Sequence, residues 1–187
     1  MPRAGLSPAA VVAIALELVD EAGPEALTLA KVAARADVAP PSLYKHVRNL
    51  AQLRSLVSAR VMDEITDRAA EAVLGRSGDD ALRSLMRAYR AYVVGHPRRY
   101  AVVLQAPPSE PGADAAGQRL LDVVLAALQA HGLEGEQAIH AARCLRSAAH
   151  GFAVLEAAGG FGLPEDLDES YDLLIGMVLA GLPKPVD

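Results

Sequence analysis

Apolar residues recur every three or four positions along almost the whole chain, and this spacing constrains the fold more than any other feature. In the first such segment Val11, Ile14, Leu18 and Val19 fall on one face of a helix. Much of the apolar content is alanine, which occurs 37 times and favours helix, whereas the aromatic residues that favour strands make up only 4% of the chain. The sequence therefore predicts an all-α protein of about nine helices.

Prolines, glycines and capping residues divide this pattern into separate helices. Ser7 followed by Pro8 is a typical helix start, and Thr28 and Asn49 are typical N-caps. A dense run of prolines predicts a loop over 107–112, and Asp168 is expected to cap the last helix. The predicted helices cover 8–22, 28–37, 42–47 after Pro40–Pro41, 50–74, 79–95, 98–106, the segment from the proline-rich loop to 130, 136–158 and 168–182.

The net charge of −5 argues at first against a nucleic-acid partner, because phosphate contacts need lysine and arginine. The charge is unevenly distributed, however. Residues 28–60 contain six Lys or Arg residues against one acidic residue, Asp37, whereas residues 61–187 contain eleven basic and eighteen acidic residues. The basic charge is therefore local to a segment near the N-terminus.

This basic segment contains the clearest motif of the chain. Thr28 caps a short helix, a turn follows over 37–40, and a second short helix carries polar residues up to Val47. In a helix-turn-helix the second helix enters the major groove of DNA and its first residues contact base edges. The motif predicts a DNA-binding domain over residues 1–50. A helix over 50–74 connects it to a helical domain over 51–187.

The segment 28–47 resembles the corresponding part of the tetracycline-repressor (TetR) family. It reads TLAKVAARADVAPPSLYKHV, with the capping Thr, the turn and the Leu-Tyr-x-His core of that family, although Asp37 stands where glycine is usual. The helices before and after the motif match the family layout. Further on, His150-Gly151-Phe152 resembles the class of TetR C-terminal domains with a His-Gly motif, called WHG-type.

The resemblance implies specific DNA contacts. It implies base-edge contacts from Pro41 and Ser42, and Arg3, on an arm before the first helix, is placed to reach a phosphate or the minor groove. Tyr44 follows the inward-pointing Leu43, so we expect it to be exposed, the alternative being a core role. The expected phosphate contacts are Thr28, Lys31, Tyr44, Lys45 and His46.

The remainder of the chain offers no catalytic or metal-binding arrangement. Ser147 and His150 share a helix face but lack the third member of a triad. His140, Cys144 and His150 have spacings of four and six, which take the last residue off the shared face. We therefore expect a protein that is not an enzyme and that has no metal or cofactor.

Two helices of the second half, the one that carries Leu120 to Leu128 and the last one, are apolar enough to bury more than one face, which predicts a second subunit. In the TetR family the last two long helices of each protomer form a four-helix dimer core, which here implies the helices over 136–158 and 168–182. A homodimer also suits the reading of a palindromic operator. The expected interface residues are Leu145, Ala149, Phe152, Leu174, Met177 and Val178.

The resemblance also implies a small-molecule effector among the central helices. Small-molecule sites are mostly apolar with a few polar groups, and segments expected to be neighbours supply that mixture. The alternative is that the tyrosines belong to the core and the charged residues to the surface. The effector would act by spreading two DNA-binding units through the helix over 50–74. The candidate residues are Met86, Tyr89, Tyr92, His96, Tyr100, Leu104, Arg143 and His150.

Taken together, these features predict a cytoplasmic, ligand-responsive transcriptional repressor. A single cysteine cannot form an internal disulfide, and neither a signal peptide nor a run of about 18 apolar residues is present, so we expect no membrane partner. The alternative is a helical dimeric module that binds small molecules or other proteins without specific DNA binding.

Overall fold

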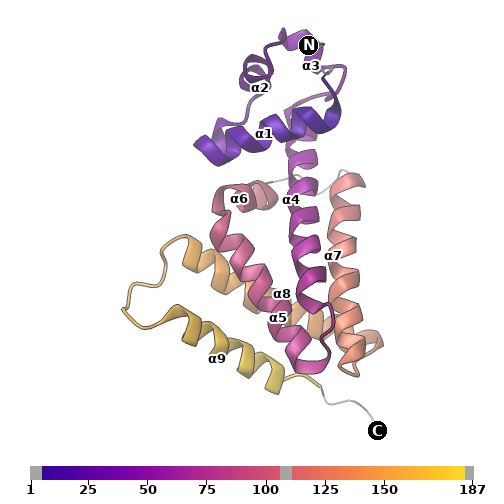
Figure 1. Cartoon of the computed structure of the whole chain (residues 1–187), viewed down its shortest axis with the longest axis vertical. Coiled ribbons are helices and arrows are strands. Elements are labelled where there is room, and N and C mark those ends of the chain that lie inside the picture. Colours follow the sequence, from indigo (N-terminus) through magenta and orange to yellow (C-terminus); the bar gives the residue numbers. More distant parts are fainter. Residues whose placement is uncertain (1–5, 106–110, 184–187) are drawn as a thin grey trace. The chain divides into compact units, whose positions relative to one another are not determined.

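The computed structural model describes residues 6–105 and 111–183, and within these ranges the chain forms helices and no strand (Figure 1). This confirms the all-α prediction. A short 3-10 helix, η1 (Pro24–Ala26), follows the first α-helix. The α-helices are α1 (Pro8–Ala22), α2 (Leu29–Arg35), α3 (Pro40–Leu43), α4 (Leu50–Val73), α5 (Gly78–Gly95), α6 (Pro97–Gln105), α7 (Pro111–Ala130), α8 (Gly135–Ala157) and α9 (Leu167–Ala180).

The capping residues at the N-terminal end of the chain act as predicted. The Ser7 hydroxyl accepts a hydrogen bond from the Ala10 N–H at 3.2 Å, and the Thr28 hydroxyl accepts one from the Lys31 N–H at 3.2 Å. Each bond satisfies one of the free N–H groups that a helix start leaves exposed. These two caps confirm the predicted starts of α1 and α2.

Three predicted boundaries are wrong. The last helix is capped by Asp166 rather than Asp168, because the Asp166 carboxylate accepts the N–H groups of both Asp168 and Glu169, at 2.6 and 3.2 Å.

Helix α7 begins at Pro111, inside the predicted loop over 107–112. Proline suits the first turn of a helix, because the N–H group that it lacks would have no hydrogen-bond partner within the helix there. The rest of that loop lies outside the described residues. Helix α3 ends at Leu43 rather than at 47, because the chain turns there so that Val47 also reaches the core.

Contacts divide the chain into two units. The first unit comprises residues 1–63 and 98–117, and thus includes α6 as well as α1, α2 and α3. Its core contains Val11 and Val19 of α1, Val32 of α2 and Leu43 of α3, each with no exposed side chain. Burying these side chains gives the short helices a stability that they would lack in isolation.

The second unit comprises residues 64–97 and 118–187 and is built around the packing of α5 against α8, with α9 packed on both. The Tyr171 hydroxyl of α9 donates a hydrogen bond to the Met86 carbonyl of α5 at 2.8 Å. Burial raises the pKa of Tyr171, so the phenol stays protonated and keeps its donor. The buried face of α8 consists almost entirely of small side chains: Ala138, Ala141, Ala142, Leu145, Ala149 and Ala153.

No helix among the described residues is long and apolar enough to cross a bilayer.

The turn between α2 and α3 yields a stability prediction. Asp37 has a φ of 54°, the left-handed region that glycine adopts without steric cost. We expect the Asp37→Gly protein to be more stable than the Asp37→Ala protein by about 1 kcal/mol, because alanine keeps the Cβ clash. Urea unfolding of both variants measures the difference. Equal stabilities would show that this turn carries no strain from its backbone.

Candidate nucleic-acid interface

The polar turn after α3 is held between two buried side chains. Leu43 and Val47 are 0% and 1% exposed, and between them Tyr44 and Lys45 are exposed and His46 is half-buried. The Tyr44 side chain is 59% exposed, which agrees with the expected surface position and excludes a core role. Buried Leu43 and Val47 therefore fix the turn, and its polar side chains are available to a partner.

Two lysines of this region are not neutralised by carboxylates of the described residues. Lys31 on α2 and Lys45 after α3 are exposed, and no ion pair between described residues involves either of them. Pro41 is exposed and Ser42 half-buried at the start of α3, and Thr28 is half-buried at the start of α2. Arg3 lies outside the described residues. The described set combines unpaired positive charge with hydroxyl groups, as phosphate contacts require.

An ion pair holds α2 on α1. The Arg35 guanidinium donates to both carboxylate oxygens of Glu21, with Nη1 to Oε1 at 2.9 Å, and it also lies 3.7 Å from Glu17. The hydrogen bond from Arg35 lowers the pKa of Glu21, which keeps the pair charged at neutral pH. A two-pronged pair of this kind adds orientation to attraction, so it sets how α2 lies on α1.

A reciprocal cap fixes the start of α4. The Asn49 carbonyl oxygen Oδ1 accepts the Gln52 N–H at 2.8 Å, and the Gln52 Oε1 accepts the Arg48 N–H at 2.7 Å. The first bond confirms Asn49 as the cap. The second resembles the return bond of a capping box, which the spacing of Asn49 and Gln52 in the sequence signals, but its donor is the N–H of the residue before the cap. Sequence reasoning missed the role of Gln52.

Arginines of α6 join the end of α1 within the first unit. Arg98 Nη1 donates to the backbone carbonyls of Asp20 and Glu21 at 2.6 and 2.9 Å. Arg99 forms two hydrogen bonds with the Asp20 carboxylate, at 2.8 and 2.6 Å. A cation at the last carbonyls of a helix is favoured by the helix dipole. Both arginines lie 77 to 79 positions from their partners in the sequence. Because of this separation, no local sequence pattern predicts these contacts.

The structure brings Tyr89 and His150 together among the expected effector residues. The Tyr89 hydroxyl on α5 lies 3.4 Å from His150 Nδ1 on α8, and both side chains are half-buried. Burial, together with nearby Arg146, lowers the pKa of His150, so the imidazole is neutral at pH 7. The pair thus offers uncharged hydrogen-bonding groups in a mostly apolar setting.

The other expected effector residues are placed differently. Tyr92 is completely buried, donates a hydrogen bond to Glu64 of α4 at 2.8 Å, and has its ring centroid 4.9 Å from that of His96. Met86 is also completely buried and Arg143 is exposed. Two candidates belong to the first unit, namely buried Tyr100 and exposed Leu104.

The expected interface residues also fall into groups. Leu145 and Ala149 are buried in the protomer's own core, whereas Phe152, Leu174 and Val178 are partly buried against that core. Met177 and Leu173 of α9 are 58% and 65% exposed, and Leu155 of α8 is 51% exposed. We call Leu155, Leu173 and Met177 the α8–α9 apolar face.

Two family models match the chain. Residues 82–178 match the model described as "Tetracyclin repressor-like, C-terminal domain", and residues 11–54 match "Bacterial regulatory proteins, tetR family". The chain belongs to the TetR family. It is a DNA-binding transcriptional regulator, and the helix-turn-helix described above is the part covered by the second match.

Similar proteins support this assignment over nearly the full length. A Bacillus subtilis protein named as an uncharacterized HTH-type transcriptional regulator is 34% identical over 97% of this chain and 95% of its own. A Mycobacterium tuberculosis protein of the same description is 38% identical over 88% of this chain and 75% of its own. The fold is also that of an Acinetobacter baumannii TetR variant crystallised with minocycline (TM-score 0.72, 22% identity, 95% and 96% of the two chains).

The hydrogen bond from the Arg48 N–H to Gln52 in this TetR-family protein can be tested directly. Replacing Gln52 with alanine removes the acceptor for the Arg48 N–H, and we expect it to lower the free energy of unfolding by about 1 kcal/mol. Gln52→Glu retains an acceptor at the same position, so it is the matched control. Thermal unfolding followed by circular dichroism compares them. Equal losses in both variants would contradict a role for this hydrogen bond.

Proposed function

We propose that this TetR-family protein is a repressor that binds a palindromic operator as a homodimer and is released by a small molecule. The observation that carries the DNA-binding part is the exposed turn with Tyr44 and Lys45, held between the buried side chains of Leu43 and Val47. A rigid support for exposed polar groups is what recognition of a fixed DNA surface needs.

The proposed contacts divide into positioning and reading groups. Lys31 and Lys45 supply unpaired charge for phosphates, and Thr28, Tyr44 and His46 supply hydrogen-bonding groups for the same backbone. Pro41 and Ser42 stand at the start of α3, the part of a recognition helix that meets base edges. Arg3 is proposed to contact DNA from the N-terminal arm.

The proposed homodimer forms through the α8–α9 apolar face. Leu155, Leu173 and Met177 are each more than half exposed in the protomer, and exposed large apolar side chains on neighbouring helices are typical of interaction surfaces. Partly buried Phe152, Leu174 and Val178 flank this face, whereas Leu145 and Ala149 support it from the core. A two-fold dimer presents two recognition helices about 34 Å apart, which matches a palindrome with half-sites one helical turn apart.

The proposed effector is an apolar or aromatic small molecule. Tyr89 and His150 support this, because they place two uncharged polar groups between α5 and α8. Met86, Tyr92, His96, Tyr100, Leu104 and Arg143 remain the wider candidate set. The A. baumannii variant with the same fold was crystallised in complex with minocycline, which supports a ligand site in a fold of this kind. Release requires that the effector bind the two states of the dimer with different affinity.

The DNA contacts yield a salt-dependent prediction. We expect Lys45→Ala to weaken operator binding and to reduce the slope of log affinity against log salt by about 1, because one phosphate contact is lost. Tyr44→Ala should also weaken binding. The measurement is a footprint and titration on DNA upstream of the protein's own gene at several salt concentrations.

Arg83→Ala is the control, since it removes one cation from α5 in the second unit. It should leave the salt slope unchanged. Absence of specific binding at low salt, where phosphate attraction is strongest, would contradict the repressor and favour a dimeric module without DNA binding.

The effector yields a second prediction. A compound that binds the folded state stabilises it by about 2.7 kcal/mol at one hundred times its Kd, which raises the melting temperature of a chain of this size by several degrees. We expect at least one member of a panel of apolar and aromatic compounds to do so, and to release operator DNA. Tyr89→Phe should reduce the shift. A panel without any shift would count against an effector of this class.

A further inference from the structure

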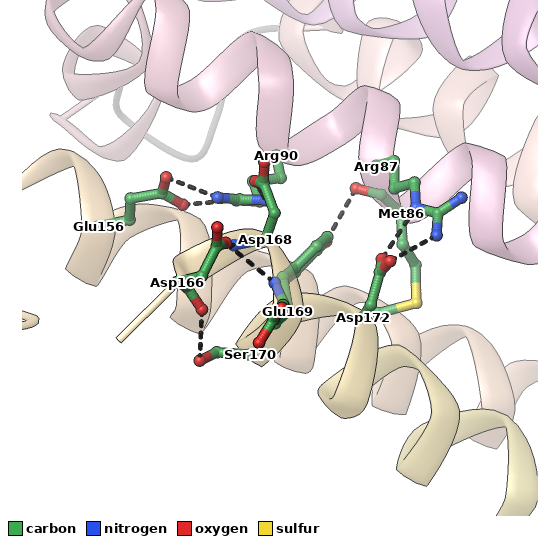
Figure 2. Close-up of polar contacts among 10 residues, drawn as sticks. Met86, Arg87, Arg90, Glu156, Asp166, Asp168, Glu169, Ser170 and Asp172 are labelled. Atoms are coloured by element: carbon green, nitrogen blue, oxygen red, sulfur yellow. Dashed lines mark hydrogen bonds and ion pairs between the residues drawn. The ribbon is translucent and has the colours of Figure 1, made fainter. Parts of the chain in front are cut away.

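Two arginines of α5 bind acidic residues of α9, and we call this set of contacts the α5–α9 clamp (Figure 2). Arg87 forms two hydrogen bonds with the Asp172 carboxylate, at 3.0 and 2.8 Å. Arg90 Nη1 donates to Asp168 Oδ1 at 2.6 Å. Arg90 also bonds Glu156 of α8 with Nε and Nη2, at 2.5 and 2.8 Å, so that one guanidinium joins three helices.

The Arg90 side of the clamp is shielded from solvent. The side chains of Arg90 and Glu156 are 14% and 13% exposed, and the guanidinium carbon lies 5.4 and 4.9 Å from the ring centroids of Phe152 and Tyr171. The hydrogen bond with Glu156 raises the pKa of Arg90, so the group stays cationic. A shielded charge that lost its partners would be strongly unfavourable, so the position of Arg90 between Glu156 and Asp168 is strictly determined.

The spacing of the clamp sets the register between the two helices. Arg87 and Arg90 are about one turn apart on α5, and Asp172 and Asp168 are about one turn apart on α9 in the opposite order. A slide of α9 by one turn, about 5.4 Å, would pair the wrong residues and leave one charge without its partner. The hydrogen bond from the Tyr171 hydroxyl to the Met86 carbonyl is a further contact that holds α9 on α5.

The orientation of α9 decides where its exposed apolar side chains lie. Helix α9 has only 14 residues, a length at which an isolated helix is marginal, so its orientation comes from its contacts with α5 and α8. Tyr171 and Ile175 are buried on the inner face, whereas Leu173 and Met177 are 65% and 58% exposed. A rotation of α9 would therefore move two of the three residues of the α8–α9 apolar face.

We propose that Arg87 and Arg90 are positioning residues for dimerisation, because they fix the register and rotation of α9 and thereby assemble the α8–α9 apolar face. This inference rests on the homodimer proposed above. It also makes α5 a direct link between the effector candidates Met86 and Tyr89 and the subunit interface, since those residues lie within one turn of the clamp on the same helix.

The test removes the α9 half of the clamp without leaving a shielded charge alone. In the double variant Asp168→Asn/Asp172→Asn, Arg90 keeps Glu156, and both replaced side chains are exposed. We expect its dimer dissociation constant, measured by sedimentation equilibrium, to rise about tenfold, which corresponds to about 1.4 kcal/mol. Far-UV circular dichroism at the same temperature should show unchanged helicity.

Glu169→Gln is the matched control, because Glu169 also lies in the first turn of α9 but forms no ion pair among the described residues. Its dissociation constant should equal that of the wild type. The charge exchange Arg87→Asp/Asp172→Arg restores one pair in the reverse sense and should dimerise more tightly than either single substitution. This recovery would show that the two residues act through their contact with each other.

Two results would overturn the inference in distinguishable ways. If the wild type dimerises and the double variant matches Glu169→Gln, the clamp does not position the interface, while the proposed dimer stands. If the wild type sediments as a monomer at all concentrations, the homodimer and the role of the clamp in it both fail.

Discussion

The close packing of α5 against the alanine face of α8 is the contact on which the second unit depends. Five of the six buried residues on this face are alanines, and only Leu145 is larger. Small side chains let two helix backbones approach closely, so polar residues at the edges of the contact come within hydrogen-bonding distance. Tyr89 meets His150 and Arg90 meets Glu156 for this reason. The candidate effector site and the α5–α9 clamp are both consequences of the same contact.

In the first unit, several separate contacts hold a short helix and the turn that follows it. Its recognition helix has only four residues, too few to be stable through its own hydrogen bonds. Buried Leu43 and Val47 hold the helix and the following turn, the Arg35 pair holds α2 on α1, and the Gln52 cap holds the start of α4. These supports leave Tyr44 and Lys45 on the surface. The support residues and the proposed DNA contacts are therefore separate sets, which allows the contacts to vary without loss of the scaffold.

The distribution of charge follows the same separation between residues that support the fold and residues proposed to contact DNA. The acidic residues that give the chain its net charge of −5 lie mostly after residue 60, and several of them are used within the fold. Glu156, Asp168 and Asp172 neutralise Arg87 and Arg90 of α5, and Asp20 neutralises Arg99. Lys31 and Lys45 form no such pair within the described part of the chain. A net charge taken over the whole chain thus says little about the partner of one segment.

Local patterns determined the class of fold, most helix boundaries and the helix-turn-helix, because periodicity, caps and turns act over a few residues. Ser7, Thr28 and Asn49 were recognisable as caps for that reason. The same local reasoning misplaced the last cap, since Asp166 and Asp168 have equal chemistry and only the path of the chain into α9 selects between them. It also could not separate core from surface among the apolar residues of α8 and α9. Leu145 and Met177 look alike in the sequence, yet packing buries one and exposes the other. The contacts between Arg87 and Asp172 and between Arg90 and its partners span 66 to 85 positions, so only the tertiary structure, by bringing α5, α8 and α9 together, decided them.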